Sequence, residues 1–231
     1  MISIAVYRAI DGTRLPVYTY WPGRGVRDAW ERAWDRSSVI LHLHGGMERG
    51  SDPERLLSTG LAARFRRGLP IRSIVVMPHC PSGRTWLDLR FALVDLVEQS
   101  KVLRFANPAH VTLTGVSMGG AGAWALASDR PDRFAAVAPI CGPIPDLPGF
   151  PGRVRRLVST PVHAFHGALD RAVPIASSIT LVDTLRRAGG NARLTTYANA
   201  AHEAWENAYD DPAFWEFLAH PPHSRGARRQ G

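Results

Sequence analysis

The sequence predicts an α/β protein in which a mostly parallel, twisted sheet carries helices on both faces. Apolar, β-branched runs recur along the chain, segments with helical spacing separate them, and most of the runs are almost continuously apolar. Continuous apolarity is typical of strands that are buried on both sides, as in a parallel sheet. Because strands that alternate with helices are joined by right-handed crossovers, the helices are expected on both faces of the sheet.

The first element is expected to be an antiparallel hairpin at one edge of the sheet. Apolar and polar residues alternate through Ile4 to Tyr7 and Pro16 to Tyr20, and Asp11-Gly12 between them is a turn signal. With the later strands, the hairpin gives a sheet of about eight strands. These later strands are Val39 to Leu43, Ile71 to Met77, Val111 to Thr114, Phe134 to Ile140, Val162 to Phe165 and Leu194 to Tyr197. The expected helices are Leu56 to Phe65, Leu89 to Leu103, Gly119 to Ser128, Ser177 to Ala188 and Pro212 to Leu218.

The length and composition fit one globular domain. The chain has 231 residues, of which 45% are hydrophobic and 21% are charged. We expect a single domain over residues 1–219 and a disordered basic tail over residues 220–231. Two cysteines without metal-type spacing are expected to be free thiols. No export signal and no run of eighteen apolar residues is visible, which predicts a cytoplasmic protein without a membrane span. The segment from residue 23 to 37 gives no pattern from which we derive a role.

The positive charge does not by itself indicate nucleic-acid binding. The formal net charge is +8, but 27 of the 28 basic residues are arginines scattered over the sequence, and three of them lie in the tail. No nucleic-acid reader motif is present, so a solvated surface explains the arginines better than a phosphate-binding groove. The alternative would require salt-sensitive retention on DNA.

A candidate nucleophile lies in Gly115-Val116-Ser117-Met118-Gly119, directly after an expected strand and directly before a helix of small residues. This is the nucleophile-elbow pattern in the context that it needs. Strand and helix nearly touch at such a turn, so the residues two positions before and after Ser117 must lack a Cβ atom. A phosphate-binding loop is disfavoured because neither G-x-G-x-x-G nor a P-loop lysine is present.

A serine nucleophile needs a general base, and His202 is the candidate. In this order of elements the acid follows the nucleophile and the histidine follows the acid. Among the histidines after Ser117, His163 lies within a buried strand and His166 at its end, whereas His202 lies in a loop after the last strand.

The acid that orients this base is expected on the loop after the preceding strand. Asp170 follows the run that begins at Val162 and fits that place. Its role would be to hold the imidazole in the correct tautomer and to stabilise the cation that forms during the reaction. Asp183 is better interpreted as part of a solvated helix face, and Glu203 is a weaker substitute.

An oxyanion hole and a substrate cleft complete the predicted site. The backbone amide of Met118 is one expected donor and that of Gly46 the other, with Met47 as second choice. The stretch from Pro143 to Thr160 leaves little room for a helical lid, which suggests an open cleft. The residues expected to line that cleft are Met47, Trp86, Pro143 and Trp205.

Together these segments resemble the α/β-hydrolase superfamily, and within it the compact branch of dienelactone-hydrolase-like and phospholipase/carboxylesterase-like enzymes. This branch includes predicted peptidases related to prolyl oligopeptidase catalytic domains. The resemblance rests on Leu43 to Gly50 as the oxyanion loop, Gly115 to Gly120 as the elbow, Pro131 to Gly142 as the following segment and His166 to Asp170 as the acid loop.

The resemblance implies an α/β-hydrolase fold without a large lid, and hydrolysis of small-molecule esters through an acyl-serine intermediate. It implies neither a metal nor an organic cofactor. A prolyl oligopeptidase-like peptidase or a thioesterase are the alternatives within enzymes. A binding protein that has kept the fold and lost catalysis is the alternative from another class. The sequence does not determine the oligomeric state.

Overall fold

A computed structural model describes residues 1–22, 38–69, 71–99 and 111–222 of the chain. Residues 23–37, the predicted helix end at residues 100–103 and tail residues 223–231 lie outside the described part. The strands are β1 Ile2–Arg8, β2 Arg14–Tyr20, β3 Val39–Leu43, β4 Ile74–Pro78, β5 Val111–Val116, β6 Ala136–Ile140, β7 Val162–Gly167 and β8 Ala192–Tyr197. The α-helices are α2 Pro53–Leu57, α3 Gly60–Arg66, α4 Arg90–Gln99, α6 Met118–Asp129, α7 Ala176–Arg187, α8 Ala204–Asp210 and α9 Pro212–Ala219. Short 3-10 helices are η1 Gly46–Glu48, η3 Pro131–Arg133 and η4 Gly152–Leu157.

One eight-stranded sheet organises the molecule, in the order β1-β2-β4-β3-β5-β6-β7-β8. β2 runs antiparallel to both β1 and β4, with Ile4 opposite Tyr18 in the hairpin. All other neighbouring strands are parallel. The predicted mostly parallel sheet and its N-terminal hairpin at the edge are therefore confirmed.

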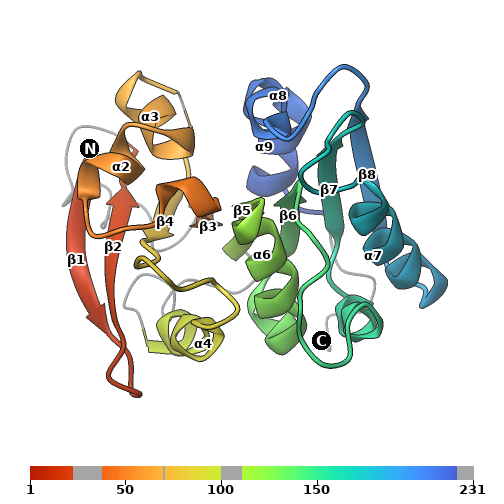
Figure 1. Cartoon of the computed structure of the whole chain (residues 1–231), viewed down its shortest axis with the longest axis horizontal. Helices are drawn as coiled ribbons and strands as arrows, with labels where there is room; N and C mark the ends of the chain where they lie inside the picture. The colour runs from red at the N-terminus through yellow and green to blue at the C-terminus, as the bar shows by residue number, and fades with distance from the viewer. Residues whose placement is uncertain (23–37, 70, 100–110, 223–231) are drawn as a thin grey trace, which may run out of the picture.

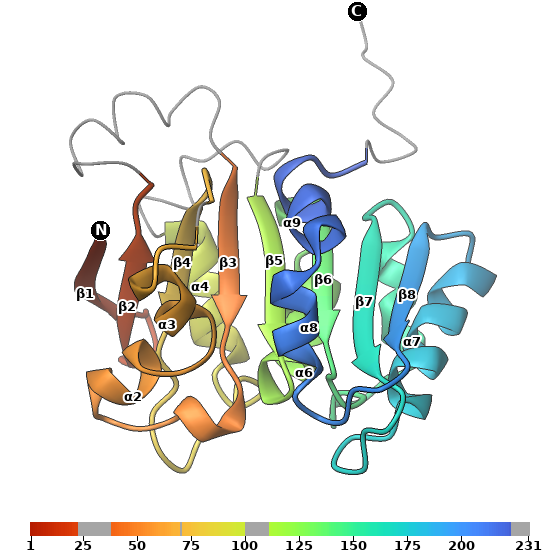
Figure 2. The ribbon, with the colours of Figure 1, turned by 90° about the horizontal axis from the view of Figure 1, so that it is seen from above.

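Helices cover both faces of this sheet. Figures 1 and 2 show α4, α6 and α7 on one face and α2, α3, α8 and α9 on the other. Each face has its own core, because successive residues of a strand point to opposite sides. Leu41 packs in the core that contains Trp124 of α6, whereas its neighbour Ile40 packs in the core that contains Phe214 of α9. Within the described chain, no helix has the length and apolar character that crossing a bilayer requires.

Two helical predictions differ from the structure. The expected helix from Leu56 to Phe65 is divided into α2 and α3, and Gly60 at the start of α3 has a φ of +50°. An added Cβ on Gly60 would lie 2.5 Å from Oε1 of Glu48, so the break leaves room for that carboxylate. The short helix α8, directly after the predicted base, was not expected.

Two strands begin later than predicted. β4 begins at Ile74 instead of Ile71, and β6 begins at Ala136 instead of Phe134. Ile71 and Phe134 nevertheless pack against the core from the preceding loops. The apolar pattern therefore extends beyond the hydrogen-bonded strand.

Candidate active site

Ser117 occupies the sharp turn between β5 and α6 and has φ 53° and ψ −113°. This positive φ is unfavourable for a residue with a side chain. The close approach of neighbouring backbone holds it in place, since an added Cβ on Gly115 would lie 2.2 Å from the carbonyl oxygen of Gly119. The amide of Ser117 also donates to the carbonyl of Ile140 at 2.9 Å. The predicted elbow geometry is therefore present.

The structure brings the three predicted catalytic side chains together. Oγ of Ser117 lies 2.8 Å from Nε2 of His202, and Nδ1 of His202 lies 2.7 Å from Oδ2 of Asp170. Asp170 follows β7, and His202 lies in the loop between β8 and α8. The side chain of His202 is 27% exposed and that of Asp170 is fully buried, so solvent reaches the imidazole but not the carboxylate.

The environment of Asp170 keeps its carboxylate ionised. Burial by itself raises the pKa of Asp170, but hydrogen bonds from His202 and the Val173 amide, together with electrostatic interactions with His202 and His166, lower this pKa overall. The other carboxylate oxygen, Oδ1, accepts the amides of Ala172 and Val173 at 2.9 and 2.8 Å. An ionised acceptor at Nδ1 requires the proton of neutral His202 to be on that nitrogen. Nε2 is then free to accept a proton from Ser117.

The predicted oxyanion loop follows β3 and is held by side-chain donors. Met118 and Gly46 each begin a helical segment, and the first amides of a helix have no partner within it. Four carbonyl groups of the loop accept side-chain hydrogen bonds, so its backbone is held in one orientation. The pairs are His44 with Trp86 at 2.8 Å, Gly45 with His44 at 2.7 Å, Gly46 with Arg49 at 2.9 Å and Glu48 with His79 at 2.8 Å. The donor roles of Gly46 and Met118 stay predictions.

His44 supports this loop in a defined tautomer. The amide of Cys80 donates to Nε2 of His44 at 3.0 Å, so Nδ1 must carry the proton that binds the Gly45 carbonyl. Burial lowers the pKa of His44 to about 3, which keeps the imidazole neutral. Its role is therefore structural.

The prediction that Trp86 lines the substrate cleft is wrong. Its side chain is fully buried, and an added Cβ on Gly122 of α6 would lie 2.7 Å from Cβ of Trp86. The indole lies edge-on to His44, with ring centroids 4.9 Å apart, and donates to the His44 carbonyl. Trp86 therefore packs in the core behind the oxyanion loop.

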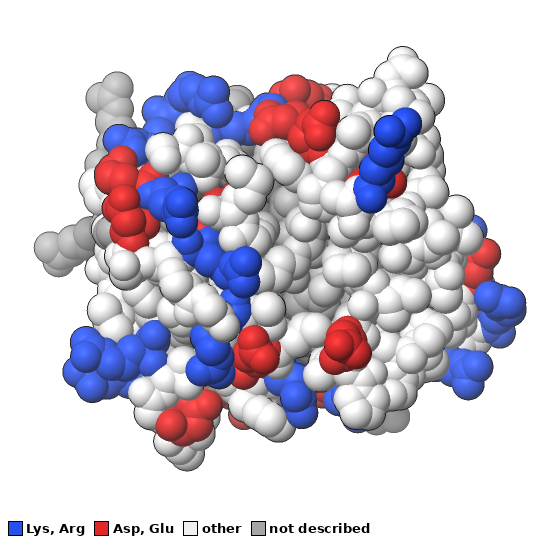
Figure 3. Space-filling view, viewed as in Figure 1, with Lys and Arg blue, Asp and Glu red and all other residues white. Residues whose placement is uncertain are grey.

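The other three predicted cleft residues are accessible. Met47 is 85% exposed, whereas Pro143 and Trp205 are half-buried. Trp205 lies beside the base, with its ring edge-on to His202 and the centroids 5.8 Å apart. Figure 3 views the face at the carboxyl ends of the parallel strands, and its centre is hollowed and mostly uncharged. The contact of Met47, Pro143 and Trp205 with substrate stays a prediction.

The two other acids that the sequence offered do not bind the imidazole in the structure. Asp183 forms an ion pair with Arg186 at 3.5 Å on α7, and Glu203, the weaker substitute, is exposed directly after His202, whose Nδ1 binds Asp170. His166, which was rejected as a base, is fully buried, and its Nε2 lies 3.2 Å from Oδ2 of Asp170. The order of motifs gave no sign of this contact.

A cluster that could in principle hold a metal coincides with the triad. Ligand atoms of Cys141, Asp170 and His202 lie within 4.8 Å of one another. The imidazole and carboxylate are already hydrogen-bonded to each other, and burial raises the pKa of the Cys141 thiol to about 12. A protonated thiol is a poor metal ligand, so the geometry favours hydrogen bonding over coordination.

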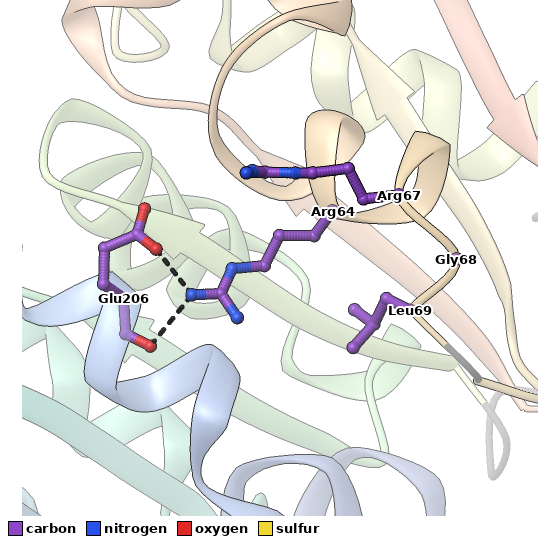
Figure 4. A pocket seen from close by; sticks show the side chains of 5 residues that line it. All are labelled: Arg64, Arg67, Gly68, Leu69 and Glu206. Atoms are coloured by element: carbon purple, nitrogen blue, oxygen red, sulfur yellow. Dashed lines mark hydrogen bonds and ion pairs between the residues drawn. The ribbon is translucent and has the colours of Figure 1, made fainter.

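Helix α8, which follows the base, is fastened to α3. Arg64 of α3 pairs with Glu206 at 2.5 Å and with Asp210, and Figure 4 shows the pair with Glu206. Arg64 and Glu206 also border a surface pocket of about 420 Å³, whose other lining residues are Arg67, Gly68 and Leu69. Nε1 of Trp205 donates to the other oxygen of Glu206 at 3.0 Å. Glu206 therefore connects Arg64 of α3 to Trp205, the residue that packs beside His202.

The chain has the α/β-hydrolase fold, and Ser117, His202 and Asp170 have the hydrogen-bonded arrangement that a serine nucleophile needs. The chain belongs to the dienelactone hydrolase family, whose model matches residues 86–213, more than half of the sequence. The predicted family is therefore confirmed, and the family match supports the predicted ester hydrolysis. A comparison with curated protein sequences gives no match.

Solved structures of esterases share the fold. A thermostable esterase superposes with a TM-score of 0.74 at 24% identity over 94% of this chain, and the chain spans 62% of that protein. A mutant feruloyl esterase module from Clostridium thermocellum, complexed with sinapinate, gives 0.68 at 17% identity, with 96% of this chain and 89% of the module covered. Esterase 2 from Thermogutta terrifontis, phosphorylated by paraoxon, gives 0.65 at 16% identity, with 96% of both chains covered. At these identities the likeness establishes the fold alone.

Proposed function

We propose that this protein is a carboxylesterase that acts through an acyl-serine intermediate. The observation that carries the proposal is the unbroken pair of hydrogen bonds from Ser117 through His202 to Asp170, at 2.8 and 2.7 Å. Membership of the dienelactone hydrolase family supports it. In this proposal Ser117 is the nucleophile, His202 the general base and Asp170 the group that orients and stabilises the imidazole.

The proposed reaction has two balanced halves. Oγ of Ser117 bonds to the ester carbonyl carbon while its proton passes to Nε2 of His202, and the Met118 and Gly46 amides stabilise the oxyanion. Collapse of this intermediate breaks the bond to the alcohol, which leaves with the proton from His202. Water then gives a proton to His202 and attacks the acyl carbon. The bond between the acyl carbon and Oγ then breaks, His202 returns its proton to Oγ, and the carboxylic acid leaves, which restores Ser117.

The open shape of the site supports a small-molecule ester as the substrate. The hollow on the face in Figure 3 is mostly uncharged. Between Pro143 and Thr160, which are fully described, the only helical segment is the six-residue 3-10 helix η4. An open, mostly uncharged hollow of this kind favours substrates that need no lid movement to enter.

A series of p-nitrophenyl esters of graded acyl length tests the proposal. The parent protein should hydrolyse short members, and Ser117→Ala should lose about 1,000-fold or more in kcat because no other group provides the nucleophile. Ser58→Ala, which changes an exposed serine outside the site, is the matched control. A fluorophosphonate should form an adduct on Ser117 of the parent protein. Failure to form that adduct would favour the catalytically silent binding protein instead.

A further inference from the structure

We infer that His166 is a positioning residue of the triad, which fixes the Asp170 carboxylate through the turn that follows it. The inference rests on the proposed function and adds a residue that acts through Asp170 without touching the substrate. His166 is the penultimate residue of β7, and its side chain and that of Asp170 are both fully buried. A buried imidazole requires partners for its polar atoms, and here they lie around the acid.

The contacts of His166 form a closed ring with the acid loop. Nε2 of His166 lies 2.9 Å from the carbonyl oxygen of Val173 and 3.2 Å from Oδ2 of Asp170. The amide of Val173 donates to Oδ1 of the same carboxylate at 2.8 Å. The carbonyl of Val173 therefore accepts a hydrogen bond from His166, and the amide of the same residue donates one to Asp170.

Elementary hydrogen-bond chemistry determines where His166 carries its proton. A backbone carbonyl can only accept, so Nε2 must be protonated to bind Val173. The N–H dipole at Nε2 consequently presents its positive end near Oδ2, the oxygen that accepts from His202. Nδ1 of His166 lies 2.8 Å from Oγ of Ser178, a buried residue in the first turn of α7. Ser178 thus fixes the ring from the other side.

This arrangement explains how Asp170 keeps one orientation. Rotation of the carboxylate would break the bonds of Oδ1 to the turn and move Oδ2 away from both imidazoles. A small displacement of the acid would misplace His202 relative to Ser117, and errors of about 1 Å in catalytic geometry cost up to about 100-fold in rate.

Two substitutions of His166 distinguish a role in positioning Asp170 from a role in filling space in the core. His166→Gln places an amide donor near the position of Nε2, whereas His166→Asn places it near Nδ1. We expect His166→Asn to lower both kcat for p-nitrophenyl acetate and the rate of phosphonylation of Ser117 by about 10- to 100-fold, with KM changed less than about twofold. His166→Gln should recover most of both rates. His163→Gln is the matched control, since His163 lies on the same strand, on the opposite face, and pairs with Thr195.

Each outcome is decisive. Wild-type rates in folded His166→Asn, or equal losses in the Gln and Asn variants, would overturn the inference. If neither variant folds, Ser178→Ala keeps the imidazole and removes its Nδ1 partner; we expect kcat about threefold lower, and an unchanged kcat would overturn the inference. Phosphonylation of Ser117 needs no ester. If the parent protein is phosphonylated but hydrolyses no ester, the proposed function fails while this inference can still be tested.

Discussion

Glu48 is a half-buried acidic residue of the oxyanion loop, and the loss of water around its carboxylate opposes folding. Its carboxylate accepts hydrogen bonds from the backbone of Gly45 and of Glu48 itself, and Oε1 lies close to Gly60 at the start of α3. Burial nevertheless dominates and raises the pKa of Glu48 above its ordinary value. The residue therefore connects the oxyanion loop to a neighbouring helix at a cost in stability.

Replacing Glu48 with glutamine should stabilise the protein near neutral pH. A carboxyl group whose pKa is higher in the folded state than in the unfolded state binds its proton more tightly in the folded state. Its ionisation therefore lowers the free energy of unfolding as pH rises from the unfolded-state pKa through the folded-state pKa. Glu48→Gln keeps the shape and removes the charge. We expect its free energy of unfolding in urea to exceed that of the parent at pH 7 and to approach it below about pH 4. Glu54→Gln, which changes an exposed carboxylate, should show no such gain. A parent protein more stable than Glu48→Gln at pH 7 would contradict the argument.

Some functional residues could be predicted from the sequence and others could not. Ser117, Asp170 and His202 follow from a local motif and from chain order, both of which are properties of the sequence. The prediction that Trp86 lines the cleft is wrong because the presence of a tryptophan in the sequence does not determine whether its side chain is buried or exposed. The contact of His166 with Asp170 depends on how the turn at Val173 folds back towards β7. Contacts of this kind require the three-dimensional structure.

At the scale of elements, the close packing of β5, α6 and β3 depends on glycine. An added Cβ on Gly119 would lie 1.9 Å from the carbonyl oxygen of Leu43. We expect Gly119→Ala to lower the free energy of unfolding by about 3 kcal/mol or more, because backbone atoms must move apart. Gly152→Ala is the control, since nothing lies within 4 Å of an added Cβ there. Thermal unfolding of both variants provides the comparison, and equal small losses would show that the elbow is not tightly packed.

The ion pairs between α3 and α8 should contribute modestly to stability. Arg64 joins Glu206 and Asp210 and also lies over the ring of Tyr209, 5.6 Å from its centroid. Because both acids are at least half exposed, we expect Arg64→Met to cost only about 1 kcal/mol at low salt and less at high salt. Arg66→Met, which removes a single exposed pair with Glu54, should cost less. Melting temperatures at low and high salt would test both, and a loss that did not depend on salt would point to packing instead.

The elements were predictable to the extent that their patterns are long and apolar. The inner parallel strands β3, β4, β5 and β6 are buried at every position, so their sequences are distinctive. Helix α8 has only seven residues, and its buried positions are Ala204, Ala208 and Tyr209, which gives too short a pattern to detect. The break at Gly60 depends on Glu48, a residue twelve positions earlier, and no local pattern contains that information.

At the scale of the whole molecule, the positive charge gathers partly beside the site. Arg49, Arg55 and Arg84 lie around the oxyanion loop and donate to backbone carbonyls. Within the described part of the chain, none of these three arginines has a carboxylate within ion-pair distance. Figure 3 shows basic side chains along one side of the hollow. With a net charge of +8, the protein should attract anions towards this face.

The rate of encounter with a charged ester should therefore depend on salt. Mono-p-nitrophenyl suberate is anionic and too long to close a cyclic anhydride on itself, and its methyl ester is a neutral control with the same scissile bond. We expect kcat/KM for the anionic ester to fall several-fold between about 10 and 200 mM salt, because the screening length shortens from about 30 Å to below 10 Å. The neutral ester should change little. Arg55→Gln and Arg84→Gln, which leave the triad intact, should reduce the slope for the anionic ester alone. An equal salt dependence for both esters would mean that salt acts on the protein itself, and the long-range attraction would then play no part in substrate capture.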